Sequence, residues 1–378
     1  MDNQNAPLIV GAGPVGLSAA MLLARYGINA RIIDQANEPA KTSRALAVNP
    51  RTLELLEPSG VTAEMLARGL KIHEVYFWRE NKLLTTISLH CIRHRYPFIL
   101  ALSQAATEKL LTEVLQKLGK QIERGIRLTT CKQENGAISA TLETSTGAQT
   151  VNPSWLLAAD GAHSTVREQL KLGFGGSGFP ELWYLADVPL SGELQQDAVH
   201  LNFFDDGGFL FMLRVVDDIR VPQNSDPLWR VLGNFPDPLS RIMRMQSTGA
   251  PVWESQFHIS HRIASQLSTG NVYLAGDAAH IHSPMGARGM NLGIEDAWSF
   301  AELMKAGQQK EYGSLRHAID QRVVRRVQAM TTVARGQSAL TRLLRLNMPP
   351  LVTHIPFLYR QLTNTADGLD HEVQIGQH

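Results

Sequence analysis

A strand, a glycine-rich turn and a helix follow one another in the segment PLIVGAGPVGLSAAMLLARYG, residues 7–27. Gly11 allows a tight turn, Gly13 lets the backbone approach a pyrophosphate, and Gly16 lets the helix pack closely on the strand. The helix N-terminus would direct free N–H groups and a positive dipole end at the phosphates. Asp34 ends the next apolar run, 18 residues after Gly16, near the ~20 expected for a carboxylate that binds a ribose hydroxyl. This order predicts a parallel α/β domain with a dinucleotide site.

A second glycine-rich segment, GDAAHIHSPMGARGMNLGIEDA, occupies residues 276–297. An apolar strand pattern precedes the segment and ends in Asp277. A helix pattern with Asn291 near its start follows. A strand carboxylate and a helix N-terminus that converge on one ligand suit a long cofactor with a second polar end, so FAD fits better than NAD. The bare glycine pattern also recurs in GFGGSG, residues 173–178, but no helix pattern follows it. We expect a flexible interdomain turn there.

Three separated motifs resemble those of the single-component FAD-dependent aromatic hydroxylases, the flavoproteins of the para-hydroxybenzoate hydroxylase type. They are GAGPVG with Asp34, the segment AADGAHSTVRE around Asp160, and the segment that joins Asp277 to GARGMN. The segments SRALAVNPRTLELL and LSQAATEKLL also resemble the family, and the resemblance covers roughly residues 7 to 330. It implies an α/β fold with a Rossmann-like FAD-binding domain, an antiparallel β-sheet substrate domain and C-terminal helices.

The resemblance also implies which residues contact FAD and NAD(P)H. The ADP half of FAD would be held by Gly11, Gly13, Pro14, Val15, Gly16, Asp34 and Gln35. Arg44 and Gln104 would contact the pyrophosphate and ribityl region, and Asp277 would bind a ribityl hydroxyl. Gly276, beside Asp277, would also contact the cofactor, and the turn against the flavin ring would include Pro284, Gly286, Gly289, Met290 and Asn291. The motif that the family associates with both FAD and NAD(P)H would consist of Asp160, Gly161, Ser164 and Arg167. No catalytic base can be named.

The activity implied by the resemblance is that of an FAD-dependent monooxygenase. NAD(P)H, bound transiently, would reduce tightly bound FAD, O2 would form a flavin C4a-hydroperoxide, and one oxygen atom would pass to an aromatic small molecule. The substrate would be phenolic, polyketide, quinone-precursor or N-heterocyclic. Two alternatives remain open. One is an FAD-binding sensor or scaffold without turnover, and the other is a flavin-dependent halogenase, although the Trp-x-Trp segment of halogenases is absent.

One position departs from the family pattern. Where the family often has Gly-Gly-Gln-Gly, this chain has Gly286-Ala287-Arg288-Gly289. A cation there could favour an anionic reduced flavin or bind a substrate carboxylate, and the alternative is a solvated arginine at a loop tip. The nearby His280 and His282 invite a metal interpretation, but we expect no metal and favour a hydrogen-bonded histidine that braces the turn.

Residues 1–75, 98–178 and 266–330 are expected to form a composite FAD-binding domain. Residues 76–97 and 179–265 would form the β-rich substrate domain, because strand patterns there alternate with Gly, Pro and Asp turns. Aromatic residues in these strands could line a pocket or belong to the core, namely Trp183, Phe203, Phe209, Phe211 and Trp229. Residues 331–378 would form a C-terminal helical segment with interruptions at NMPP and HIPF.

Charge and composition limit the partners. The chain has 36 Lys+Arg against 35 Asp+Glu, so nucleic acid is not an expected partner. Its two cysteines suit a reducing compartment, no uncharged run is long enough to span a bilayer, and we expect a cytoplasmic protein that could form a homodimer. Between Tyr312 and Asn364 there are eight arginines and one acid. This segment could contact a membrane surface, but we favour helices packed across the FAD domain with their basic faces in water.

Overall fold

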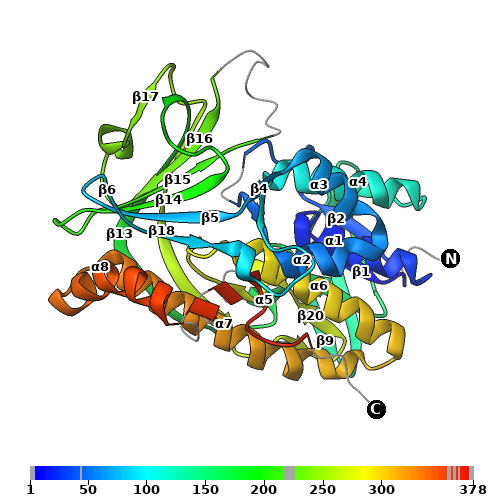
Figure 1. Cartoon of the computed structure of the whole chain (residues 1–378). Coiled ribbons are helices and arrows are strands. Elements are labelled where there is room, and N and C mark those ends of the chain that lie inside the picture. Colours follow the sequence, from blue (N-terminus) through cyan, green and yellow to red (C-terminus); the bar gives the residue numbers. More distant parts are fainter. Residues whose placement is uncertain are drawn as a thin grey trace.

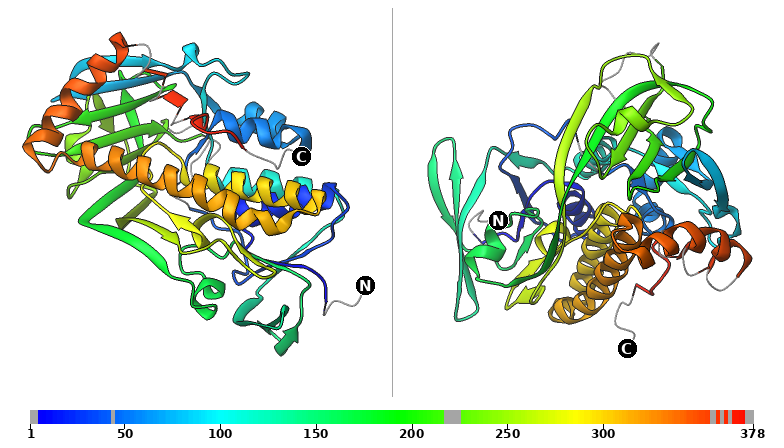
Figure 2. Two further views of the ribbon diagram at one scale, coloured as in Figure 1. Left: turned by 90° about the horizontal axis from the view of Figure 1, so that it is seen from below. Right: turned by 90° about the vertical axis from the view of Figure 1, so that its left-hand side faces the viewer.

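The computed structural model describes residues 5–42, 45–216, 226–355, 359–360, 363–364 and 367–373. A large sheet fills one side of the molecule, and a smaller sheet with its helices lies on the other (Figure 1). The long helix α7 (Tyr312–Arg335) runs along both parts, and α8 (Ala339–His354) continues from it beside the large sheet (Figure 2). The expected combination of a Rossmann-like domain, a β-rich part and C-terminal helices is confirmed.

The smaller sheet is the expected parallel one. Its order is β19 (Ser268–Thr269), β20 (Val272–Leu274), β12 (Leu156–Ala158), β1 (Leu8–Val10), β2 (Arg31–Asp34) and β8 (Ile122–Arg124). Only β19 is antiparallel to its neighbour. Helix α1 (Pro14–Arg25) packs between α4 (Gln104–Lys117) and α6 (Gly289–Ala306). Strands β1, β12 and β20 are fully buried, which explains why they are continuous apolar runs.

The larger sheet is nine-stranded and almost entirely antiparallel. Its order is β21 (His280–Ile281), β18 (Trp253–Ala264), β13 (Phe174–Gly192), β16 (Leu228–Gly233), β15 (Phe209–Arg214), β14 (Ala198–Phe203), β5 (Glu74–Arg79) and β6 (Lys82–Ser88), with β17 (Met245–Ser247) beside β13. Strands β14 and β5, which lie far apart in the sequence, pair in parallel.

The GFGGSG segment is not the expected flexible turn. Phe174 to Gly178 begin β13 and pair with β18. At Gly176, φ is +143° and a Cβ would lie 2.0 Å from the His261 carbonyl oxygen, so this glycine allows the two strands to approach closely. The expected domain boundary at residues 178/179 therefore falls inside a strand.

Two further small sheets complete the N-terminal half. One contains β9 (Arg127–Glu134), β10 (Ala137–Thr144) and β11 (Gly147–Val151), and the other contains β3 (Ala47–Val48), β7 (Ile99–Ala101) and β4 (Leu70–Ile72). Short helices lie near them, namely α2 (Pro50–Leu56), α3 (Val61–Arg68) and α5 (Thr165–Gln169).

The C-terminal helices correct two expectations. The NMPP segment does not interrupt the helix, because Pro349 and Pro350 both lie inside α8, which ends at His354, while Pro356 of the HIPF segment lies outside the described residues. The basic side chains do not all face water, because Arg316 and Arg345 are only 1–2% exposed. Arg345 donates hydrogen bonds to the carbonyls of Gly207, Gly208 and Ala334, and so fastens α8 to the turn between β14 and β15 and to α7. None of the helices among the described residues is long and apolar enough to cross a bilayer.

Candidate functional site

The predicted site segments meet at one edge of the parallel sheet. Each follows the carboxyl end of a strand: the first glycine turn follows β1, Asp34 ends β2, Asp160 follows β12 and Asp277 follows β20. Strand β2, the next strand along the chain, pairs with one side of β1, and β12 pairs with the other side of β1. Ligands of open α/β sheets bind in the crevice at such a switch point.

The glycines of the first turn have three different surroundings. At Gly11, φ is +100° and a Cβ would lie 2.2 Å from the Ala159 carbonyl oxygen. At Gly16 a Cβ would lie 1.9 Å from the Gly11 carbonyl oxygen, so both positions require glycine for packing. A Cβ at Gly13 would meet no atom within 4 Å, and Gly13 lines a large cavity. No side chain caps the N-terminus of α1 there, so its N–H groups remain available to an anion.

Asp34 is tied to the same turn. Its Oδ2 accepts a hydrogen bond from the Ala12 N–H at 2.7 Å, and its Oδ1 accepts one from the Ala36 N–H at 2.8 Å. Each carboxylate oxygen retains a lone pair for a ribose hydroxyl. Gln35 beside it is exposed, and Arg44, the remaining residue expected near the pyrophosphate, lies outside the described residues.

The cavity at this edge extends from α1 to the large sheet and has a volume of about 1680 Å³. The predicted cofactor residues that line it are Gly13, Pro14, Val15, Gln104, Gly161, Arg167, Asp277, Pro284, Gly286, Gly289 and Met290. The others are not part of its lining, namely Gly11, Gly16, Asp34, Gln35, Asp160, Ser164, Gly276 and Asn291. A single continuous space thus joins the dinucleotide turn to the sheet.

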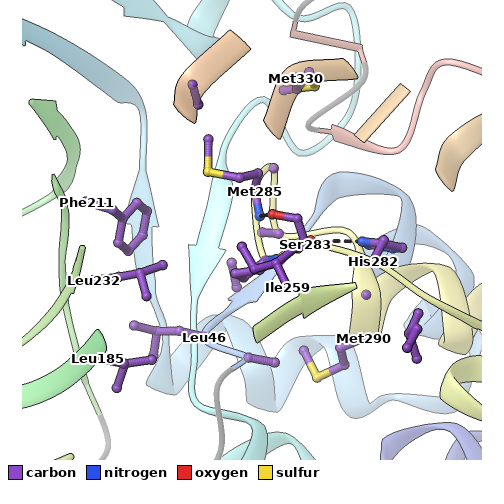
Figure 3. Close-up of a pocket in the computed structure, with 18 of the residues that line it drawn as sticks. Leu46, Leu185, Phe211, Leu232, Ile259, His282, Ser283, Met285, Met290 and Met330 are labelled. Atoms are coloured by element: carbon purple, nitrogen blue, oxygen red, sulfur yellow. Dashed lines mark hydrogen bonds between the residues drawn. The ribbon is translucent and has the colours of Figure 1, made fainter. Parts of the chain in front are cut away.

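The end of the cavity at the large sheet is apolar. Figure 3 shows side chains from several elements around it, including Leu46, Leu185, Phe211, Leu232, Ile259, Met285 and Met330. Of the five aromatic residues considered from sequence, Phe203 and Phe211 line the cavity. Trp183, Phe209 and Trp229 are fully buried core residues. The sequence could not separate the two groups, because strand alternation does not tell which face covers a cavity.

His282 is a polar group in this wall. Its Nδ1 donates a hydrogen bond to the Ser283 carbonyl at 2.9 Å (Figure 3). Burial lowers the pKa of His282 to about 3, so the ring is neutral at physiological pH. The bond to the carbonyl places the ring proton on Nδ1.

The Asp160 motif braces the loop after β12. Asp160 accepts hydrogen bonds from the Val166 N–H and from the Ser164 side chain, while burial raises the pKa of the Asp160 carboxyl. Arg167 is 4% exposed, lies over the Phe174 ring at 3.8 Å, and donates to the Ala278 carbonyl at 3.0 Å. The motif therefore joins the loops that follow β12 and β20, and Gly161 and Arg167 face the cavity.

The second glycine cluster packs against the first. A Cβ at Gly276 or Gly293 would lie 2.7 or 2.6 Å from the Val15 side chain, so Gly276 lets the loop after β20 approach the start of α1 and Gly293 lets α6 do so. Asn291 is buried and its amide is fully used. It donates to the Ala47 and Ala287 carbonyls and accepts from the Asn49 N–H. Its side chain holds the turn before α6 in place.

Arg288 is not a solvated arginine at a loop tip. It is 1% exposed, and its Nη2 lies 3.3 Å from Asp370 Oδ1. Asp370 also pairs with Arg326 at 2.6 Å, and Asp367 is fully buried nearby, where burial raises its pKa to about 7 despite the positive charge of Arg288. Arg288 does not line the cavity. The C-terminal segment of residues 367–373 therefore holds the turn from outside.

We expect Asp370→Asn to lower the free energy of unfolding by about 1–3 kcal/mol, because the buried Arg288 guanidinium loses its anionic partner. Glu372 is exposed, and Glu372→Gln is a matched control with an expected change within about 0.5 kcal/mol. Urea denaturation followed by circular dichroism measures both. Equal midpoints for the two variants would show that the segment does not stabilise the turn.

A buried charge cluster lies behind the cofactor loops, and sequence reasoning missed most of it. His280 Nε2 lies 2.7 Å from Asp296 Oδ2, and Asp296 also accepts a hydrogen bond from the Gly276 N–H at 2.9 Å. Arg316 on α7 donates to Asp296, Glu295 and Asp320 at 2.7–2.8 Å. His280, Asp296 and Asp320 could come together around a metal ion, but Arg316 already binds both carboxylates.

Comparisons with known proteins agree with this geometry. A family described as an FAD binding domain matches residues 5–227 and 236–327. The 6-methylpretetramide 4-monooxygenase of Streptomyces rimosus is 36% identical over 320 residues, 80% of this chain and 57% of that protein. Pentachlorophenol 4-monooxygenase of Sphingobium chlorophenolicum is 31% identical over 91% of this chain and 68% of that protein. This chain thus spans between 57% and 68% of the length of these two curated relatives.

The fold is also shared with a solved structure. The p-nitrophenol 4-monooxygenase PnpA from Pseudomonas putida superposes with a TM-score of 0.84 at 20% identity, covering 97% of this chain and 98% of that chain. The family match extends over both glycine clusters and the Asp160 motif. The chain therefore belongs to the FAD-binding-domain family, and its resemblance to the FAD-dependent aromatic hydroxylases is confirmed.

Proposed function

We propose that this chain is an FAD-dependent, NAD(P)H-consuming monooxygenase that hydroxylates an aromatic small molecule. The observation that carries the proposal is that one cavity contains both a dinucleotide cradle and an apolar chamber. Gly13 and the uncapped start of α1 lie at one end, and the side chains of the large sheet lie at the other. A flavin that spans this cavity would present its ring to a substrate in the chamber.

The residues present fit FAD. The α1 N-terminus and the open backbone at Gly13 would bind the pyrophosphate, Asp34 a ribose hydroxyl, and Asp277 a ribityl hydroxyl. The turn from Pro284 to Gly289 would lie against the ring. When bound, FAD supplies the electron transfer from NAD(P)H and the activation of O2. The apolar walls of the chamber would exclude water and orient the aromatic ring.

The proposal also covers the remaining partners. NAD(P)H would bind transiently near Asp160, Gly161, Ser164 and Arg167, of which Gly161 and Arg167 line the cavity. The relatives named above act on 6-methylpretetramide and pentachlorophenol, so polyketides and phenols are the first substrate classes to test. A cytoplasmic location and a homodimer remain predictions.

The absorbance spectrum of the purified protein, followed by NAD(P)H oxidation with a panel of phenols, polyketides and quinolones, tests the proposal. We expect a yellow protein whose NAD(P)H oxidation rises with one class of compound and yields a product heavier by one oxygen atom. Flavin without stimulated oxidation would favour the sensor alternative, and a chlorinated product in the presence of chloride would favour the halogenase. A colourless protein that FAD cannot reconstitute would contradict the cofactor assignment.

A further inference from the structure

Helix α8 is apolar on two sides. Its inner side closes the cavity, where Pro349 and Val352 contribute to the lining together with the side chain of Arg345. Its outer side carries Leu340, Leu343 and Leu351, which are 64%, 60% and 50% exposed. An ordinary surface helix of a globular protein has polar residues on that side.

The exposed apolar side chains are concentrated on this helix. Of the eight large apolar side chains that are exposed among the described residues, five lie on α8 or directly after it, namely Leu340, Leu343, Met348, Leu351 and Ile355. At 100° per residue, Leu340, Leu343 and Leu351 fall within an arc of roughly 80°. They form one stripe, which we call the α8 stripe. The helix lies at the edge of the molecule, and none of the other helices and strands that the structure describes covers its outer side (Figure 2).

The segment that carries the stripe is rich in arginine. Residues 321–366 contain seven arginines and no aspartate or glutamate, but Arg345 is buried and Arg326 and Arg335 pair with Asp370 and Glu181. Arg342 in the first turns of α8 and Arg360 beyond its end are both exposed, so cations lie near both ends of the stripe. Strand β6, on which α8 packs, adds the exposed Lys82.

We propose that the α8 stripe lies on an anionic lipid surface. A helix with leucines on one side and flanking arginines sits in the interface, with its apolar residues among the acyl chains and its cations near anionic headgroups. A second copy of this chain is a poorer occupant, because pairing two such faces would bring the exposed arginines of the two copies together. The inner side of α8 lines the cavity, so an aromatic substrate dissolved in the bilayer would have a short path into the chamber. That last step rests on the proposed function, whereas lipid binding does not.

Sedimentation of the holoenzyme with vesicles tests the proposal. We compare phosphatidylcholine vesicles with vesicles that contain 30% phosphatidylglycerol (roughly the anionic load that attracts basic surfaces). We expect binding to the anionic vesicles, weakened by high salt because the charges are screened. The variant Leu340→Gln/Leu343→Gln/Leu351→Gln should bind at least about tenfold more weakly. The matched control is Leu118→Gln/Val252→Gln, which removes two exposed apolar side chains elsewhere and should bind like the parent.

Light scattering and turnover of a water-soluble substrate separate the remaining outcomes. The triple variant should keep its circular dichroism spectrum and its turnover, since none of the three leucines lines the cavity. Equal vesicle binding by parent and triple variant, or no binding by the folded parent, would overturn the proposal. A dimer that the triple variant abolishes, without vesicle binding, would assign the stripe to a second copy. If neither the parent nor any variant turned over substrate while the parent still bound vesicles, the result would count against the proposed function alone.

Discussion

Replacing Gly13 with alanine will leave the apoprotein as stable as the parent and weaken its affinity for FAD by at least about tenfold, or ~1.4 kcal/mol. A Cβ at Gly13 meets no protein atom within 4 Å, so the folded chain accommodates it. The same Cβ projects at the uncapped start of α1, where the backbone must approach the pyrophosphate. Titration of apoprotein with FAD, followed by flavin fluorescence, measures the change.

Gly16→Ala is the contrasting variant, and its effect will be on folding. Its Cβ would lie 1.9 Å from the Gly11 carbonyl oxygen, and neither backbone segment can move without displacing α1 from β1. We expect the free energy of unfolding of the apoprotein to fall by roughly 3 kcal/mol, at the upper end of overpacking costs. If Gly13→Ala destabilised the apoprotein as much as Gly16→Ala, the two glycines would share a packing role and the phosphate assignment would lose its support.

The parts of the site that are local in sequence could be predicted. A strand, a glycine turn and a helix that follow one another within twenty residues specify their own geometry, so the turn before α1 and the loop after β20 were located from spacing alone. Asp34 was found for the same reason. The parallel sheet then followed, because strands that alternate with helices pair in parallel.

The parts that depend on distant segments could not be predicted. From the sequence, Arg288 fits either a cation beside the flavin or substrate or a solvated arginine, because nothing in GARG indicates that residues 367–373 cover it. Arg316 and Arg345 were grouped with surface arginines, since charge counts do not reveal which side chains point inward. The GFGGSG segment has the composition of a loop, but its glycines serve the close pairing of β13 with β18. In each case a tertiary contact overrode the local pattern.

Arg316→Gln on α7 will destabilise the protein strongly. Arg316 is fully buried and donates to three carboxylates, those of Glu295, Asp296 and Asp320. Removing one partner from a buried ion network leaves uncompensated charge and costs about 3–5 kcal/mol. Arg322→Gln on the exposed side of the same helix is the matched control, with an expected change within about 0.5 kcal/mol.

The loss will also depend on pH, which distinguishes electrostatics from lost packing. Burial already raises the pKa of Asp320 to about 7, although Arg316 opposes this shift, and Arg316 also lowers the pKa of Glu295 and of Asp296. Without Arg316, the pKa of Asp320 in the folded state rises further above its value near 4 in the unfolded chain, and the lowered pKa values of Glu295 and Asp296 rise as well. The folded variant then binds more protons than the unfolded chain, so its free energy of unfolding increases as pH falls from 8 to 5. Urea denaturation across this range should show a deficit relative to the parent that is largest at pH 8, whereas a deficit that is constant with pH would indicate that Arg316 acts through packing alone.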